Sequence, residues 1–154
     1  MPTVYEITLL TAALGSGLIA GLCFAFASFL MSAFDELGAE QAIRTMQAIN
    51  SRILRSSAMT VWFGTALVAV AVPILAPSGE RTLPIVAAAL YLIGAILITG
   101  RGNVPLNEAL DRVDPGSEEA ASRWRDYRQR WGRWNGLRTL VCALACALFT
   151  LAPW

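Results

Sequence analysis

The amino-acid sequence predicts an all-α integral membrane protein, a four-helix bundle with an amphipathic interfacial helix after helix one and an aromatic-rich helix leading into helix four. Of its 154 residues, 56% are hydrophobic and 15% are charged, whereas soluble domains are about half apolar and about a quarter charged. Four long stretches of the sequence contain no charged residue. A helix needs roughly 20 apolar residues to cross the hydrocarbon of a bilayer. The uncharged runs are 7–34, 56–77, 83–100 and 140–154.

The first span is expected over about 7–34. It carries small residues at intervals of four, a spacing that lets membrane helices approach closely. Glu6 precedes the run where a signal peptide would have a basic stretch, so the run is interpreted as a permanent helix. The whole chain, 1–154, is then a single transmembrane domain. The small residues at this spacing are Ala13, Gly17, Gly21 and Ala25.

The segment 40–55 is predicted to be the amphipathic interfacial helix. At 100° per residue its large apolar residues, such as Met46, share one arc, and Asn50 lies near the middle of that arc. An amide within an apolar stripe is unfavourable unless it is hydrogen-bonded. We therefore expect Asn50 to turn into the bundle and to contact helix three or four.

Three more spans are expected after the interfacial helix. Pro105 lacks a backbone donor and disfavours helical geometry at Val104, so the end of helix three is expected to be kinked or unwound. Helix four is preceded by the aromatic-rich helix. The expected ranges are about 56–77, 83–103 and 135–153 for helices two to four, and about 117–134 for the aromatic-rich helix.

Arg138 is the charge that this arrangement places inside a span. Because the chain stops at Trp154, a span of roughly 20 residues has to begin near Asn135. A cation inside a span indicates a functional site, and the alternative is that its side chain extends to the lipid headgroups. The aromatic face of 117–134 is likewise either part of a site or an interfacial aromatic belt.

The arginines predict how the bundle is oriented. When four helices alternate in direction, the loops after helix one and after helix three lie on the same side. These loops and the adjoining helix ends hold every basic residue of the chain except Arg81. Since basic residues in short loops stay in the cytoplasm, both termini are expected outside, in a bacterial plasma membrane.

The absence of several residue types narrows the possible chemistry. The sequence has no histidine, the commonest metal ligand and general base. Cys23, Cys142 and Cys146 lie in the spans without a Cys-x-x-Cys motif, so they are interpreted as small buried hydrophobes, the alternative being a redox pair or a metal thiolate. No metal and no cofactor is therefore expected. A net charge of +1 offers no basic field for nucleic acid, and membrane lipid, an aromatic or quinone-like small molecule, and a homo-oligomer remain as candidate partners.

The alternating topology gathers polar side chains at the cytoplasmic ends of the helices. Four amides and one guanidinium would lie there beside a tryptophan and a tyrosine, forming an aromatic pocket with a polar floor. Such a pocket suits a flat aromatic molecule that carries phenol or carbonyl oxygens. The alternative is an interhelical hydrogen-bond network that only fixes the bundle. The candidate substrate-binding residues are Asn50, Asn103, Asn107, Tyr127, Trp131, Asn135 and Arg138.

Four stretches of the chain form a recognisable set, namely GLCFAFASFLM (21–31), MQAIN (46–50), TGRGNVPLN (99–107) and WRDYRQRWGRWNGLR (124–138). Through them, and above all through NVPLN and W-x2-Y-x3-W-x2-WN-x2-R, the chain resembles the anthrone oxygenase-like family of membrane proteins. The resemblance implies four membrane helices. For the polyketide members it also implies oxidation of an anthrone to an anthraquinone by O₂, without metal or flavin.

Two positions depart from the family pattern, which commonly has His after the Trp-Asn pair and Pro after the Met of the first stretch. Here these positions are Gly136 and Ser32. Oxidation of an anthrone needs a base for its acidic CH₂ group and a cation for the resulting anion. Arg138 is the candidate cation, whereas no base is evident. The sequence leaves two functions open: a cofactor-free oxygenase of a phenolic polycyclic aromatic, or a non-catalytic membrane module that binds a quinone or lipid or stabilises a membrane complex.

Overall fold

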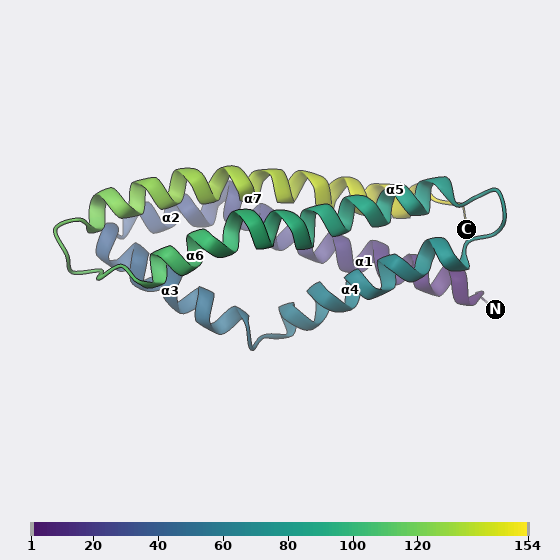
Figure 1. Ribbon diagram of the computed structural model, residues 1–154, viewed down its shortest axis with the longest axis horizontal. Helices are drawn as coiled ribbons and strands as arrows, with labels where there is room; N and C mark the ends of the chain where they lie inside the picture. Colours follow the sequence, from purple (N-terminus) through teal and green to yellow (C-terminus); the bar gives the residue numbers. More distant parts are fainter. Residues whose placement is uncertain (1, 154) are drawn as a thin grey trace.

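The computed structural model describes residues 2–153, so Met1 and Trp154 lie outside it, and every regular element in this range is a helix. Four helical rods are long and apolar enough to cross a membrane. They run side by side in alternating directions, which brings both termini to one end of the bundle (Figure 1). The predicted all-α four-helix membrane bundle is confirmed. The rods are Val4–Glu36, Ser57–Leu75, Thr82–Asp111 and Ala120–Leu151.

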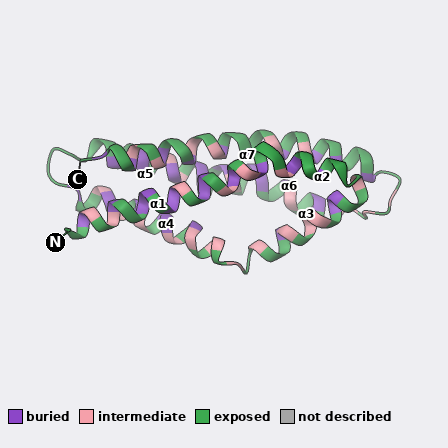
Figure 2. Cartoon of the chain, turned by 180° about the vertical axis from the view of Figure 1, so that it is seen from behind, coloured by how far each residue is buried: buried purple, intermediate pink, exposed green. Residues whose placement is uncertain are grey.

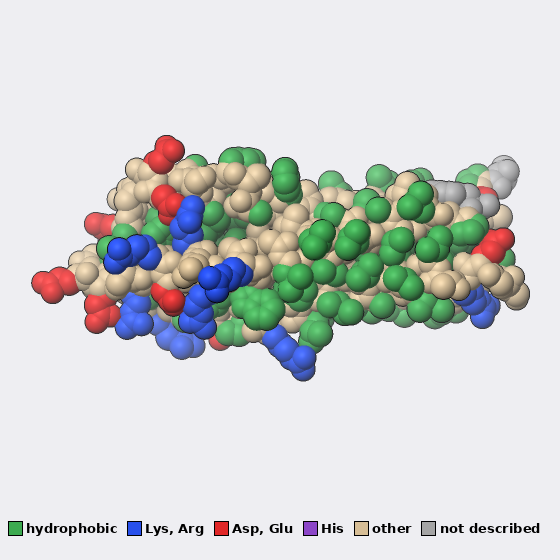
Figure 3. All heavy atoms as spheres, turned by 90° about the horizontal axis from the view of Figure 1, so that it is seen from above, with side chains coloured by type: hydrophobic (Ala, Val, Ile, Leu, Met, Phe, Trp, Pro, Cys, Tyr) green, Lys and Arg blue, Asp and Glu red, His purple; other side chains and the backbone are tan. Residues whose placement is uncertain are grey.

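The outer surface of the bundle fits a lipid environment. Apolar side chains cover the part of the surface nearer the termini, whereas most acidic and basic side chains gather at the opposite end (Figure 3). Leu14, Leu67 and Ile74 are 61%, 75% and 69% exposed, and the buried residues lie along the inner faces of the helices (Figure 2). Water disfavours an apolar surface of this extent, whereas hydrocarbon is a favourable solvent for it.

The first rod is a continuous helix in three parts. It begins at a capping box, in which Thr3 Oγ1 accepts a hydrogen bond from Glu6 N at 3.2 Å and the Glu6 carboxylate accepts one from Thr3 N at 2.6 Å. Its middle part is a single π-helical turn, in which the hydrogen bonds reach back five residues. The three parts are α1 (Val4–Ala25), η1 (Phe26–Leu30) and α2 (Met31–Glu36).

The last rod is the single helix α7 (Ala120–Leu151), which joins the expected aromatic-rich helix and the expected fourth span without a break. It packs closely against α1, as the small-residue spacing predicted. Cys146 Sγ donates to Ala13 O at 3.3 Å, and a Cβ added at Gly17 would lie 3.2 Å from the same sulfur atom. The close approach therefore occurs at Ala13 and Gly17.

The third rod stays helical through Pro105, so the unwinding expected there does not occur. Val104 is helical, with φ −59° and ψ −49°, and its N–H bonds to Thr99 O, five residues back. This wider π-helical turn accommodates the proline ring and its missing donor, and the helix continues past 103. Its parts are α5 (Thr82–Tyr91), the π-helical η2 (Leu92–Asn103) and α6 (Val104–Asp111).

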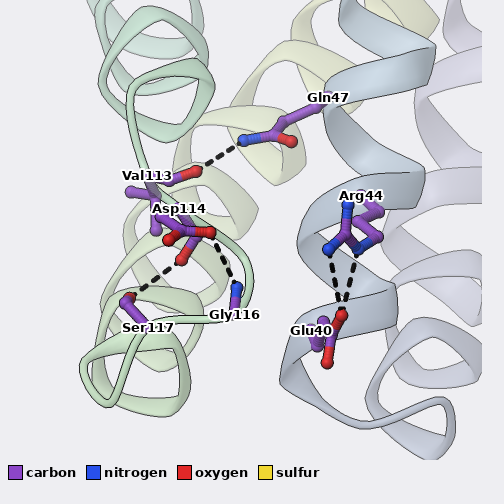
Figure 4. A network of polar contacts seen from close by, with 7 residues as sticks. All are labelled: Glu40, Arg44, Gln47, Val113, Asp114, Gly116 and Ser117. Carbon is purple, nitrogen blue, oxygen red and sulfur yellow. Dashed lines mark hydrogen bonds and ion pairs between the residues drawn. The ribbon is translucent and has the colours of Figure 1, made fainter.

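The predicted amphipathic helix is α3 (Ala39–Ile53), which packs against α2, α6 and α7. Gln47 Nε2 on α3 donates to Leu110 O and to Val113 O, both at 3.0 Å, and so ties α3 to the end of α6 (Figure 4). α3 then meets α4 (Ser57–Leu75) at a bend that stands away from the other rods (Figure 1).

Two hydrophobic cores fill the bundle. The alanine-rich core lies in the half nearer the termini, and the aromatic core lies in the half that contains α3 and α6. The alanine-rich core includes Leu9, Ala12, Ala69, Ala87, Tyr91, Ala145 and Phe149. The aromatic core includes Phe26, Phe34, Met46, Trp124, Tyr127 and Trp131.

Candidate functional site

A cavity of about 460 Å³ lies where the two cores meet, at the bend between α3 and α4. Ligand pockets in proteins commonly measure about 300–1,000 Å³, so the cavity can hold a small molecule. Its apolar lining includes Leu22, Phe26, Met46, Ile49, Met59, Trp62, Phe63 and Trp131. Its polar lining includes Asn50, Thr99, Asn103, Asn107, Glu108, Asp111 and Arg138.

Arg138 on α7 is held firmly at the cavity wall and is only 7% exposed. Its Nη2 donates to Asn135 Oδ1 at 2.7 Å, and its Nη1 donates to Thr99 Oγ1 at 3.3 Å. Its guanidinium carbon lies 5.2 Å from the ring centroid of Trp62 and 5.7 Å from that of Trp131, within reach of cation–π attraction. Arg138 therefore faces the interior and does not extend to lipid headgroups.

Asn135 lies behind this guanidinium and does not line the cavity. It is fully buried, and its Nδ2 donates to Cys23 O on α1 at 2.9 Å. Its Oδ1 is the acceptor for Arg138. Both ends of the amide are thus used to hold the guanidinium, so Asn135 positions Arg138.

Three buried side-chain atoms at the cavity have no hydrogen-bond partner within the part of the chain that the structure describes: Asn103 Oδ1, Trp131 Nε1 and Arg138 Nε. The three residues are 1%, 3% and 7% exposed. Buried polar atoms are nearly always paired, and each unpaired one costs about 1–3 kcal/mol. Two donors and one acceptor are thus left unpaired on three residues that line a single cavity.

The remaining candidate residues lie at or next to the same cavity. The Tyr127 hydroxyl donates to Asn107 Oδ1 at 3.0 Å, and its ring stacks on Trp131 at 6.1 Å with an interplanar angle of 30°. Tyr127 is therefore a support for Asn107 and Trp131. The candidates that line the cavity are Asn50, Asn103, Asn107, Trp131 and Arg138.

Two carboxylates at the cavity were missed by reasoning from the sequence. Asp111 and Glu108 line it, although they lie beyond the uncharged run of helix three. Asn50 Nδ2 donates to Asp111 Oδ1 at 3.3 Å, which confirms that Asn50 turns into the bundle and meets a polar partner. The signal was the spacing of 103, 107 and 111, which places three polar residues on one face of a helix that continues past Pro105.

The described residues contain no group of three or more His, Cys, Asp and Glu side chains placed to hold a metal ion. The cavity presents amides, indoles, carboxylates and one guanidinium. These groups can bind oxygen atoms of an aromatic ligand, stabilise an anion and accept a proton.

Comparison with known proteins gives one match. The model of the family described as anthrone oxygenase matches residues 43–148, more than half of the chain, and this segment contains every polar cavity residue from Asn50 to Arg138. No curated protein and no solved structure matches the chain.

Proposed function

The chain belongs to the anthrone oxygenase family, and we propose that it oxidises a phenolic polycyclic aromatic with O₂ inside the cavity. The observation that supports this most is the set of unpaired atoms on Asn103, Trp131 and Arg138 around a largely apolar space. A mostly apolar pocket with a few convergent polar groups favours a flat apolar molecule with oxygen atoms at its edge.

The unpaired atoms suggest where the oxygen atoms of such a ligand would lie. Trp131 Nε1 and Arg138 Nε are donors, so a ketone or phenolate oxygen would accept from them. Asn103 Oδ1 is an acceptor, so a phenol hydroxyl would donate to it. The fused rings would then lie against the indoles of Trp62 and Trp131, which line the cavity.

Arg138 would supply the electrostatic part of the reaction. An anthrone has a CH₂ group between two aryl rings, and loss of a proton from it gives an enolate-like anion with charge on the ketone oxygen. A buried guanidinium that Asn135 and Thr99 already hold in place stabilises this charge without reorganisation. The electron-rich anion then reacts directly with O₂, so the proposal includes neither a metal nor a flavin.

A non-catalytic module that binds a quinone or a lipid is the rival function. A quinone carbonyl would accept from the same two donors, and Gly136 stands where the family pattern commonly has His. The two functions differ in whether O₂ is consumed. The experiment therefore adds an anthrone to the detergent-purified protein and follows O₂ uptake together with the absorbance of the anthraquinone product.

Catalysed O₂ uptake above the rate of autoxidation, with one anthraquinone formed per O₂, is the result expected for the oxygenase. Autoxidation is measured with the same amount of heat-denatured protein. Tight binding of an anthraquinone without catalysed O₂ uptake would exclude the oxygenase and establish the quinone-binding module.

We propose in addition that the cavity lies toward the cytoplasm and that both termini lie outside. The uneven distribution of arginine, with only Arg81 at the terminal side, supports this orientation. Thr3→Cys and Ser117→Cys variants report on opposite ends of the bundle. An impermeant thiol reagent applied to intact cells should label the first variant, and labelling of the second variant alone would reverse the orientation.

A further inference from the structure

We infer that Asp111 is the general base that removes a proton from the substrate, and that Asn50 positions it. The inference rests on the proposed oxygenase function, which needs a base in a chain without histidine. Among the residues that line the cavity, Asp111 and Glu108 are the carboxylates. Three observations favour Asp111: its place in a row of polar residues, its contact with Asn50, and its access to water.

The row of polar residues leads from the buried end of the cavity to its exposed end. Asn103, Asn107 and Asp111 are spaced four residues apart and share one face of the rod. Asn103 is 1% exposed, and its Nδ2 donates to Trp131 O at 3.3 Å, whereas Asp111 is exposed. The two ends of the row are about 12 Å apart along the helix axis, and side chains tilt toward the helix N-terminus, which brings the carboxylate back toward Asn107.

This placement suits the geometry of an anthrone. The acidic CH₂ group of an anthrone lies across the central ring from the ketone. When the ketone accepts from Trp131 and Arg138, the CH₂ group points away from these donors, along the row toward Asp111. A base beside Arg138 would face the ketone instead.

Asn50 gives the carboxylate a fixed orientation. It is 7% exposed on the buried face of α3, and its amide donates to Asp111 Oδ1 at 3.3 Å. The second oxygen of the carboxylate is left to accept the proton, which then passes to water. The charged and titratable groups that line the cavity with Asp111 are Glu108 on α6, Arg138 on α7 and Cys23 on α1. Tyr127 on α7 also interacts electrostatically with Asp111.

The reaction balances with O₂ as the only oxidant. Asp111 takes a proton from the CH₂ group, and the electron pair of the broken C–H bond stays on the carbon. The carbanion gives one electron to O₂, and the radical pair combines to form the C–O bond of a peroxide. Elimination breaks the peroxide O–O bond and the second C–H bond, leaving a ketone and hydroxide, which becomes water with the first proton. The carbon is oxidised from CH₂ to C=O, and O₂ is reduced to the ketone oxygen and water.

The test compares Asp111→Asn with Glu108→Gln in the detergent-purified protein. The expected result for Asp111→Asn is a kcat lower by about 100-fold, since general-base catalysis contributes roughly 10²–10⁴, with an unchanged Kd for anthraquinone measured by tryptophan quenching. The difference in kcat between this variant and the wild type should become smaller as the pH rises, because the anthrone then loses its proton without the Asp111 carboxylate. A substrate with CD₂ in place of CH₂ should show a larger isotope effect in this variant.

Matched variants separate this role from a structural one. Asp126→Asn makes the same chemical change at an exposed ion pair with Arg130 on α7 and should keep the wild-type kcat. Asp111→Glu should recover part of the activity, because it restores a carboxylate. Asn50→Ala should lower kcat without changing the Kd, and it serves as the second test if Asp111→Asn does not fold.

The outcomes distinguish the base from the function on which it rests. A wild-type kcat in Asp111→Asn, a larger loss in Glu108→Gln, or loss of anthraquinone binding together with kcat would each overturn Asp111 as the base while leaving the oxygenase intact. A wild-type protein that consumes no O₂ would overturn both.

Discussion

The alanine-rich core and the aromatic core treat their buried polar groups differently. In the alanine-rich core each tryptophan or tyrosine hydrogen bond is made within the bundle: Trp62 Nε1 donates to Ala95 O at 2.9 Å, and the Tyr91 hydroxyl donates to Trp62 O at 3.0 Å. In the aromatic core Trp124 Nε1 and the Tyr127 hydroxyl also have partners, but Trp131 Nε1 has none among the described residues. A tryptophan N–H therefore has a structural hydrogen bond in one half and no partner in the other. The unpaired N–H belongs to a residue that lines the cavity.

The two cores also divide the tasks of the bundle: one packs closely and stabilises the fold, and the other contributes to the cavity. Close helix contacts in the alanine-rich half leave little empty space, because alanine and glycine admit neighbouring backbones. Where this half meets the aromatic core, large rings and the bend between α3 and α4 leave a cavity of about 460 Å³. Unpaired polar atoms are unfavourable there, and the stability of the packed half offsets them.

The largest effect is expected for Arg138→Leu, which removes the cation from the site. Loss of one electrostatic stabiliser of a transition state costs about 10²–10³ in kcat, and anthraquinone binding should weaken as well. The bundle should stay folded in mild detergent, because only two side-chain oxygens, Asn135 Oδ1 and Thr99 Oγ1, lose the donor that Arg138 gives them. O₂ uptake and thermal unfolding measure the two effects.

Arg133→Leu is the control for this change. Arg133 lies on the same helix and is exposed, so kcat should be unchanged. If Arg138→Leu unfolded the protein, the polar residues around Arg138 would be a structural network.

A smaller effect, on stability, is expected where glycine permits close helix contact. A Cβ added at Gly102 would lie 2.5 Å from the Trp134 ring, and one added at Gly15 would overlap the Thr65 side chain. Gly102→Ala and Gly15→Ala should therefore each lower the free energy of unfolding by about 1–3 kcal/mol. Gly132→Ala, with no atom within 4 Å of the added Cβ, should raise it by up to about 1 kcal/mol.

Equal stabilities of Gly102→Ala and Gly132→Ala would show that the contact with Trp134 is loose. If only Gly15→Ala lowered the free energy of unfolding, the two cores would differ further, since only the alanine-rich half would then need glycine for close helix contact.

Much of the fold follows from the sequence because it depends on length and polarity. Four uncharged runs predicted four rods, and the apolar arc around Asn50 predicted a buried amide. The unwinding expected at Pro105 does not occur, because the effect of a proline depends on the hydrogen-bond register of the preceding turn, which one sequence does not reveal. The same error hid Asp111, since a helix that ends near 103 cannot carry it along the cavity.

The site was only partly predictable for a related reason. Spacing placed Asn135 and Arg138 on one face of a helix, but a face contains both the residue that meets a ligand and the residue that holds it. Which of them lines the cavity depends on α1, whose Cys23 carbonyl accepts from Asn135. A contact between distant segments is not encoded in local periodicity.

A still smaller effect is expected when a tryptophan donor is removed and a smaller aromatic ring takes the place of the indole. Trp131→Phe should weaken anthraquinone binding by about 1 kcal/mol, the net value of a typical hydrogen bond. It should lower thermal stability less than Trp62→Phe does, because both changes remove the same ring volume and Trp131 Nε1 has no partner to lose. Trp62→Phe should instead lower the free energy of unfolding by about 1 kcal/mol through the loss of the hydrogen bond to Ala95 O. A loss of stability in Trp131→Phe equal to that in Trp62→Phe would remove the distinction between the two cores.

The smallest effect is expected for Gly136→His, which restores the residue that the family pattern commonly has after Trp-Asn. Gly136 is exposed, does not line the cavity, and has no atom within 4 Å of an added Cβ. It lies two residues before Arg138 on α7, and at 100° per residue the two positions point about 160° apart, so an imidazole there faces away from the guanidinium of Arg138. We therefore expect Gly136→His to leave kcat and its pH dependence unchanged, both alone and combined with Asp111→Asn. Restoration of activity to Asp111→Asn by this histidine would show that position 136 reaches the reacting carbon, and the base would then have to be assigned to α7 in place of α6.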